Sequence, residues 1–199
     1  MNNLNKILAA IVFVFSLVVY IMTMAPTTSF WDCGEFIATS VIMGVPHPPG
    51  TPFFLLLGNF FSQLPIFADT GARVNLISPI FSAFAVMFLY LIIVQLIEEW
   101  HGKAKTWPDF LITYGSAIIG ALTFAFTDSH WFNAVEAEVY SISTFFTSIV
   151  VWLILKWSTN SGHAGNVRYI LIIAYMFGLA IGIHLLNLLA LPLDRKSVV

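Results

Sequence analysis

Two carboxylates in the first polar stretch of the sequence are the residues best suited to chemistry. Asp32 and Glu35 are three positions apart, so a short helix would present both on one face. Neighbouring carboxylates can divide acid–base work, because their surroundings and their mutual repulsion separate their pKa values. One of them could accept the proton of an acceptor hydroxyl while the other holds a sugar or the acceptor. The alternative is a pair of ordinary solvated acids, which the spacing alone favours.

A histidine and an arginine follow in the same region. His47 lies in the stretch 46–52, which contains four prolines and one glycine and is therefore predicted to be a stiff turn. A histidine held there could bind a phosphate or orient an acid, or it could be incidental to a turn that begins a helix. Arg73 precedes the second apolar run, where its permanent, two-pronged charge suits a phosphate. The alternative is an arginine whose side chain extends toward the lipid headgroups and has no role in a site.

Two further pairs of polar residues are candidate substrate contacts. Glu136 and Glu138 are two positions apart, so one helix face cannot present both and at most one should point into a site. His184 and Asn187 are three apart on one face of the last predicted helix, where polar groups face the bundle interior or a cavity. They could form an interhelical hydrogen bond or contact a substrate. The sequence shows no glycine-rich phosphate loop, no nucleophile elbow and no strong set of metal ligands.

The composition predicts that transmembrane helices position these residues. The chain is 59% hydrophobic and only 9% charged, whereas soluble domains carry about 25% charged residues. An all-α polytopic membrane protein is therefore predicted. The net charge of −2 gives no sign of nucleic-acid binding. The single cysteine, Cys33, excludes an intrachain disulfide and is interpreted as a small buried residue.

Five apolar runs approach the length of about 20 residues that a transmembrane helix needs. The predicted spans are Ile7–Met24, Val74–Ile97, Phe110–Thr127, Val139–Trp157 and Tyr169–Leu191. The first run is longer than the core of a secretory signal and lacks a good cleavage site, which predicts an uncleaved signal anchor. Residues 53–64 are too few to span. They are predicted to form an interfacial or re-entrant helix between Pro52 and Pro65.

The placement of lysine and arginine predicts the orientation of these helices. Five positive residues fall on one side of the five-span arrangement. That side is therefore predicted to be cytoplasmic and to hold the N-terminus. They are Lys6, Lys103, Lys105, Lys156 and Arg168. The polar stretch 26–73 and the two glutamates at 136 and 138 fall on the other side. The chemistry is therefore predicted at the non-cytoplasmic face.

Several motifs together resemble the GT-C superfamily, integral membrane glycosyltransferases that use polyprenyl-phosphate sugars. The shared features are an outer Asp/Glu pair after the first span, a His-Pro-Pro turn into an amphipathic helix, and an Ala-Arg step into the next span. The stretches 26–36, 47–52, 132–140 and 184–187 are similar to a bacterial membrane family related to an animal transmembrane protein O-mannosyltransferase. The resemblance extends from residue 1 to about residue 193. Members of that family are much longer, so this chain is expected to be an N-terminal part.

The resemblance implies a reaction and its partners. It implies inverting transfer of a sugar, by analogy mannose, from a polyprenyl-phosphate donor to a Ser or Thr hydroxyl of an acceptor protein. Asp32 matches the position of the catalytic base, and Glu35 lies beside it. Arg73 matches a position near the donor phosphate. His47 matches a position with a structural or donor-binding role. The implied location is a bacterial plasma membrane with the active loop outside the cytoplasm. Divalent metal is needed by some members of the superfamily and not by others.

Other interpretations concern the end of the chain and the kind of function. Residues 194–199 read like the peptide encoded by a sequencing adapter, so we expect a non-native tail after a native segment 1–193 of one transmembrane domain. A transporter is an alternative function, but the interiors of the predicted spans lack the charged residues usual in ion pathways. A non-catalytic scaffold subunit is the second alternative, and it would need no acid at residue 32.

Overall fold

Helices form all the regular structure in the described part of the chain. The computed structural model describes residues 3–48, 51–159 and 166–184. The elements are α1 (Asn3–Thr23), α2 (Cys33–Ile42), α3 (Pro52–Ser62), α4 (Thr70–Asn75), α5 (Ile77–His101), α6 (Trp107–Phe110), the π-helical segment η1 (Leu111–Gly115), α7 (Ser116–Ala125), α8 (Asp128–Ala134), α9 (Val139–Thr159) and α10 (Val167–Ile181). The predicted all-α class is confirmed.

Four helical segments within the described residues are long and apolar enough to cross a membrane. They are Asn3–Thr23, Thr70–His101, Trp107–Ala125 and Val139–Thr159. Each contains most of one predicted span, so the first four spans are confirmed by length and composition. A helix suits these segments because the hydrocarbon core offers the backbone no water, and a helix satisfies its own N–H and C=O groups.

The described part of the fifth predicted span is not helical throughout. Its helix, α10, ends at Ile181, and residues 182–184 are not helical. The 15 residues of α10 extend about 22 Å, which is less than the hydrocarbon core of about 30 Å. His184 therefore follows α10 instead of lying on it, contrary to its predicted place on that helix. Asn187 and the predicted tail 194–199 lie outside the described residues.

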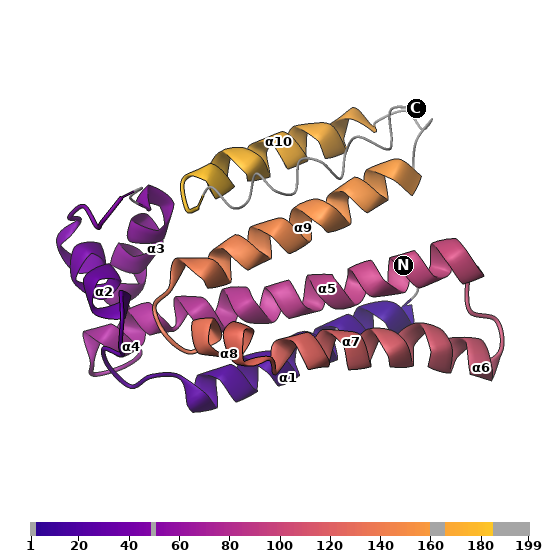
Figure 1. The fold of residues 1–199 in the computed structure, drawn as a ribbon, viewed down its shortest axis with the longest axis horizontal. Helices are drawn as coiled ribbons and strands as arrows, with labels where there is room; N and C mark the ends of the chain where they lie inside the picture. Colours follow the sequence, from indigo (N-terminus) through magenta and orange to yellow (C-terminus); the bar gives the residue numbers. More distant parts are fainter. Residues whose placement is uncertain (1–2, 49–50, 160–165, 185–199) are drawn as a thin grey trace.

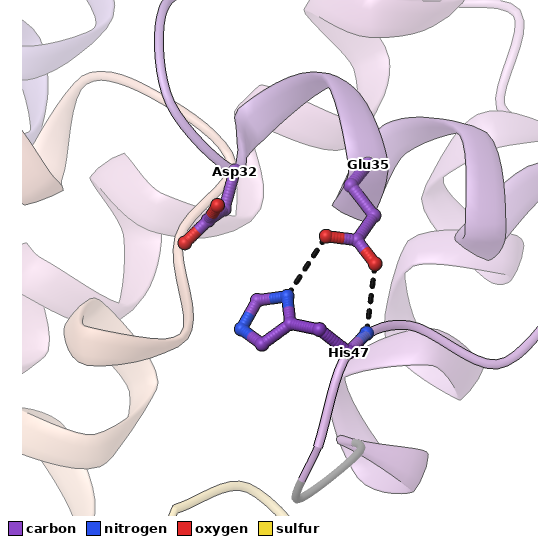
Figure 2. Close-up of side chains that lie close together, drawn as sticks. All are labelled: Asp32, Glu35 and His47. Carbon is purple, nitrogen blue, oxygen red and sulfur yellow. Dashed lines mark hydrogen bonds and ion pairs between the residues drawn. The ribbon is translucent and has the colours of Figure 1, made fainter.

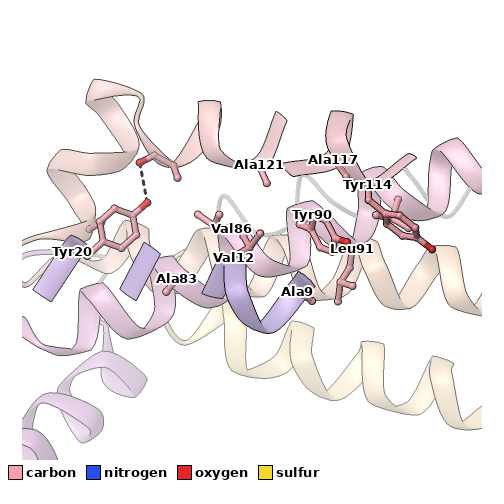
Figure 3. Close-up of a cluster of buried hydrophobic side chains, with 13 residues drawn as sticks. Ala9, Val12, Tyr20, Ala83, Val86, Tyr90, Leu91, Tyr114, Ala117 and Ala121 are labelled. Atoms are coloured by element: carbon pink, nitrogen blue, oxygen red, sulfur yellow. Dashed lines mark hydrogen bonds between the residues drawn. The ribbon is translucent and has the colours of Figure 1, made fainter. Parts of the chain in front are cut away.

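α5 is the central helix of the bundle (Figure 1). It contacts α1 and α7 on one side and α9 on the other, while α10 packs outside α9. Small buried side chains such as Ala83, Ala117 and Ala121 let α5 and α7 approach closely (Figure 3). A Cβ atom added to Gly120 would lie 2.9 Å from Cδ1 of Ile93. A larger residue at position 120 would require the end of the Ile93 side chain to move.

A proline separates α4 from α5. Pro79 lies in the first turn of α5, where its missing N–H has no helical partner to lose. In a continuous helix the proline ring would clash with the backbone carbonyl of the residue four positions earlier, which is Asn75. The helical segment therefore breaks at Leu76, between the end of α4 and the start of α5. This break leaves the Asn75 side chain wholly buried at the end of the bundle.

α2, α3 and α4 form a small cluster at the same end of the bundle (Figure 1). α3 matches the helix predicted over 53–64 and begins at Pro52. A Cβ atom on Gly58 of α3 would overlap the Ser40 hydroxyl of α2, so only glycine allows this approach. The Asn59 amide donates to the carbonyls of Ser40 at 3.0 Å and Val41 at 3.3 Å, at the end of α2. These contacts fix α2, which carries the two predicted acids.

Candidate active site

The two predicted acids lie at the start of α2. Asp32 is the residue before the helix, and Glu35 lies in its first turn. Carboxylates are favoured there because the first N–H groups of a helix carry partial positive charge. The preceding residue, Trp31, has φ 59°, a left-handed backbone that bulky residues rarely adopt. Strained backbone thus immediately precedes the first acid.

A tight turn returns the chain from the end of α2 to Glu35. Met43 adopts φ 51°, and the N–H of Gly44 donates to the Thr39 carbonyl at 2.8 Å. His47 then reaches Glu35 with two groups. Its backbone N–H donates to Glu35 Oε1 at 2.7 Å, and its Nδ1 lies 2.8 Å from Glu35 Oε2 (Figure 2). Both carboxylate oxygens of Glu35 are therefore engaged by one residue.

The Asp32 carboxylate completes this group. In Figure 2 the imidazole of His47 lies between the two acids. One ligand atom from each of Asp32, Glu35 and His47 lies within 4.8 Å of the others. Among the described residues, no partner forms a hydrogen bond or ion pair with the Asp32 carboxylate, which is exposed. The two acids therefore differ: Glu35 is committed to His47, and Asp32 is available.

These three residues also form a candidate set of ligands for a divalent cation. Two carboxylates and one imidazole suit transition metals such as Zn²⁺. The fit is partial, because Glu35 already uses both oxygens to hold His47. In that arrangement Nδ1–H donates to the carboxylate, which leaves Nε2 of His47 as the ring atom open to a metal or a phosphate. Sequence analysis missed this set because His47 is separated from the acids by the whole of α2.

The Glu35–His47 contact is expected to be strongest in a window of mildly acidic pH. The hydrogen bond from His47 lowers the pKa of Glu35. The same bond raises the pKa of His47, and the negative charges of Asp32 and Glu138 also raise it. The stabilisation by Glu35 is present above about pH 4.3 and is lost as the pH falls through its folded pKa. The stabilisation by His47 is present below about pH 6.5 and is lost as the pH rises through its folded pKa.

Proton titration of His47 by NMR measures this coupling. In Glu35→Gln the pKa of His47 is expected to fall toward its ordinary value, because the anionic partner is gone. Glu99→Gln removes an acid at the far end of α5 and should leave the His47 titration unchanged. An unchanged titration in Glu35→Gln would contradict the contact.

A buried asparagine brings the segment 135–138 to the same place. The Asn75 amide donates to the carbonyls of Ala25 at 2.9 Å and Thr27 at 2.8 Å. Its Oδ1 accepts from the N–H of Ala137 at 3.0 Å, and the Cys33 thiol lies 3.6 Å from the same oxygen. Asn75 therefore ties together the chain before α2, the start of α2 and the segment that carries the two glutamates.

Both glutamates of that segment are buried. Glu136 is 1% exposed and Glu138 is 5% exposed. The backbone N–H of Glu138 donates to Ser78 Oγ at 3.3 Å, which fixes it over the start of α5. Burial, followed by the negative charges of Glu136 and Asp32, raises the pKa of Glu138 to about 7, although a backbone hydrogen bond from Val139 and the charge of His47 act in the opposite direction. The charges of Asp32 and His47 therefore affect the pKa of Glu138.

Glu138 is expected to make the protein less stable as the pH rises toward 7. Its folded pKa is raised, so the folded state holds a proton that the unfolded state releases between about pH 4.5 and pH 7, and stability falls through that window. A pKa shift of this size corresponds to a decrease in the unfolding free energy on the order of 3 kcal/mol across that window. Glu138→Gln should remove this part of the pH dependence of the unfolding free energy, whereas Glu99→Gln should retain it. Identical pH profiles for the wild type and Glu138→Gln would contradict the shift.

Arg73 makes contacts that the sequence did not indicate. Its Nε donates to the Phe67 carbonyl at 2.6 Å, and its two terminal nitrogens donate to the carbonyls of Ser62 at 3.1 Å and Ala68 at 3.2 Å. The guanidinium therefore supports the end of α3 and the turn that follows it. Three of its five N–H groups are used in this way, and its role at a donor phosphate stays a prediction.

His184 lies against the start of α9. Its ring is 5.4 Å from that of Tyr140, which is two residues beyond Glu138. The residues around it join α10 to α3, because the N–H of Phe53 donates to the Gly182 carbonyl at 3.1 Å. The structure thus places His184 beside Tyr140, and its contact with a substrate stays a prediction.

Comparison with known proteins gives relatives that match this site region. The family model described as "Protein O-mannosyl-transferase TMEM260 N-terminal domain" matches residues 32–194. A protein O-mannosyl-transferase tmem260 from Dictyostelium discoideum is 28% identical over 197 residues, which cover 92% of this chain and 22% of that relative. The Mus musculus protein of the same name is 26% identical over 163 residues, 82% of this chain and 21% of the relative. No solved structure matches.

The match covers most of the chain but little of its relatives. The chain spans about a fifth of the length of the curated relatives. The family model begins at Asp32 and includes Glu35, His47, Arg73 and both buried glutamates. Because the model matches far more than half of the chain, the chain belongs to the family of the protein O-mannosyl-transferase TMEM260 N-terminal domain.

Proposed function

We propose that this chain is the N-terminal part of a GT-C-type membrane glycosyltransferase. The reaction is inverting transfer of a sugar, by analogy mannose, from a polyprenyl-phosphate donor to a Ser or Thr hydroxyl of a protein. It takes place at the non-cytoplasmic face of a bacterial plasma membrane. Family membership supports the class of reaction, and the printed names of the relatives support the protein acceptor and mannose.

The convergence of Asp32, Glu35 and His47 is the observation that supports a reaction centre here. Three polar groups within 4.8 Å lie at one end of a bundle of apolar helices. One of the three, the Asp32 carboxylate, is exposed and engaged by no other described residue. A general base needs such an available oxygen, because it must reach the proton of the acceptor hydroxyl.

The proposed step is a single displacement. The Asp32 carboxylate accepts the proton of the acceptor hydroxyl as its oxygen attacks the anomeric carbon of the sugar. The bond between that carbon and the donor phosphate oxygen breaks, and its electron pair leaves with the polyprenyl phosphate. Attack opposite the leaving group inverts the anomeric configuration.

The neighbouring residues have separate roles in this proposal. Glu35 is a positioning residue, because both its oxygens hold His47. His47 carries a raised pKa, so its protonated ring can neutralise charge on the leaving phosphate. Arg73, Glu136, Glu138, His184 and Asn187 are proposed to contact donor or acceptor. A divalent cation held by Asp32, Glu35 and His47 would supply the same phosphate neutralisation.

Sugar transfer by the full-length protein tests this function. The assay uses purified protein in detergent, radiolabelled polyprenyl-phosphate mannose and a pool of Ser/Thr-rich peptides, with and without a chelator. Label in the peptides is the expected result, and loss of transfer on chelation would assign the cation a role. Transfer from glucose or another lipid-phosphate sugar in place of mannose would correct the donor. No transfer from any such donor would favour a non-catalytic scaffold.

A further inference from the structure

Trp31 is an exposed tryptophan held in an unfavourable backbone conformation. It is 83% exposed, and its φ of 59° lies in the left-handed region. That region costs a bulky residue free energy, so it persists only where the surrounding structure imposes it, and such strain collects at functional sites. Trp31 directly precedes Asp32, the carboxylate of the proposed reaction centre that no other described residue engages.

Contacts on both sides of Trp31 fix the segment that contains it. On the N-terminal side, the Asn75 amide donates to the Thr27 carbonyl at 2.8 Å. On the C-terminal side, the Cys33 thiol lies 3.6 Å from Asn75 Oδ1, and Cys33 is wholly buried. One buried side chain therefore holds both ends of the short segment 27–33. The left-handed backbone of Trp31 is thus held by contacts that lie outside its own side chain.

Exposure alone does not require a strained backbone. Trp100 and Trp107 are 95% and 73% exposed, at the end of α5 and the start of α6, which lie at the opposite end of the bundle from α2 (Figure 1). Tryptophan is common at membrane surfaces, and these two are exposed without a positive φ. In the described ranges only Trp31 and Met43, among residues other than glycine, have one. Trp31 therefore differs from the other exposed tryptophans in its backbone and in its neighbour Asp32.

The proposed reaction places the sugar within reach of this ring. A base lies about 2.6–3.2 Å from the hydroxyl oxygen whose proton it accepts, and that oxygen lies about 3–3.5 Å from the carbon that it attacks. The attacked carbon of the sugar is therefore within about 7 Å of the Asp32 carboxylate. Consecutive Cα atoms are about 3.8 Å apart, so an indole at position 31 can cover that distance.

An indole face suits the carbon skeleton of a sugar. The face of a pyranose ring carries several C–H groups, and dispersion attraction to a flat aromatic ring sums over all of these contacts. The negative face of the indole also attracts the partial positive charge of those C–H groups. Asp32, Glu35 and His47 offer polar contacts, so Trp31 adds the apolar surface that they do not provide.

We propose that the Trp31 ring packs against a C–H face of the donor sugar and contributes to the choice of the sugar that is transferred. The inference rests on the proposed function and extends it by assigning a residue to the sugar itself. Fixed backbone holds position 31 before the donor arrives, so less conformational freedom is lost on binding. Because the ring contacts the sugar and not the polyprenyl chain, it strengthens binding of the glycosylated donor only.

Equilibrium binding to the full-length protein in detergent tests this inference. The probes are radiolabelled polyprenyl-phosphate mannose, its glucose counterpart, and polyprenyl phosphate without a sugar. Trp31→Leu keeps an apolar side chain but removes the ring. It should weaken binding of the sugar donor about tenfold, as loss of one stacking contact does, and leave binding of polyprenyl phosphate unchanged. Trp31→Phe should restore most of the donor affinity, because it keeps an aromatic face.

Two control variants separate the ring from exposure and from strain. Trp100→Leu removes an exposed tryptophan at the far end of α5 and should change the binding of no probe. Trp31→Gly releases the strain, because glycine adopts a positive φ freely. It should unfold at no lower temperature than the wild type and yet bind the sugar donor as weakly as Trp31→Leu. Met43→Gly relaxes the other left-handed residue and should keep the donor affinity, because glycine preserves the turn.

The outcomes distinguish this inference from the proposed function. Equal weakening of the sugar donor and of polyprenyl phosphate in Trp31→Leu would overturn the sugar contact in favour of the lipid. Unchanged binding of every probe would also overturn it, while leaving the transferase proposal intact. Donor binding by Trp31→Phe that is no better than that of Trp31→Leu would overturn the contact with a ring. A wild-type protein that binds no lipid-phosphate sugar would contradict the proposed function, and this inference with it.

Discussion

Replacing Asp32 by Asn in the full-length protein should reduce sugar transfer by about 10²–10⁴-fold, the usual contribution of a general base. The amide cannot accept the acceptor proton, while its size and exposure are unchanged. Because the Asp32 carboxylate has no partner among the described residues, its replacement breaks no contact that holds the fold. The rate of label transfer to peptide at saturating donor measures the loss, and the unfolding temperature should stay that of the wild type.

A second exposed acid provides the matched control. Asp128→Asn changes an exposed carboxylate at the start of α8, outside the Asp32 group. It should leave transfer near the wild-type rate. Glu35→Gln should lower transfer less than Asp32→Asn and should also release His47. Undiminished transfer in Asp32→Asn would remove Asp32 from the role of base while leaving the transferase proposal intact.

Replacing Asn75 by Ala should destabilise the protein by at least about 3 kcal/mol, since a buried group left unsatisfied costs about 1–3 kcal/mol. The change leaves the N–H of Ala137 and the carbonyls of Ala25 and Thr27 without their partner. The Asn75 side chain is fully buried, so a cavity is added to this loss. The unfolding free energy in mixed micelles, titrated with sodium dodecyl sulfate, measures the effect.

The control for this change is an asparagine with a purely local bond. The Asn133 amide donates to the Ser129 carbonyl within α8. Asn133→Ala should change the unfolding free energy by no more than about 0.5 kcal/mol, as is usual at the surface. If Asn75→Ala were as mild as Asn133→Ala, Asn75 would not be the residue that joins the two outer stretches.

The sequence was sufficient for the features that depend on composition and short spacing. Four spans followed from apolar length, and α3 followed from the apolar run between Pro52 and Pro65. The proximity of Asp32 and Glu35 followed from their spacing at the start of one helix. These are local properties, so neighbouring residues alone determine them.

The features that depend on distant contacts could not be predicted in this way. His47 reaches Glu35 only because Met43 takes a left-handed backbone, which methionine rarely adopts. The bonds from Arg73 to the carbonyls of Ser62 and Phe67 could not be predicted, because residues 6 and 11 positions away come together only in the folded chain. The end of α10 at Ile181 was missed because the apolar pattern continues beyond it.

The bond from Asn75 to Ala137 also sets the order in which the protein can mature during synthesis. The two residues are 62 positions apart, so a ribosome adding about 5–20 residues per second needs on the order of 3–12 seconds to supply the second partner. During that interval the Asn75 oxygen has the weak Cys33 thiol donor but lacks the backbone N–H of Ala137. The stretch that holds Asp32 reaches its final shape after residues 135–137 arrive, since Ala25 also binds the Val135 carbonyl at 2.8 Å. The nascent chain therefore enters the membrane before the segment that carries Glu136 and Glu138 can join the stretch that holds Asp32.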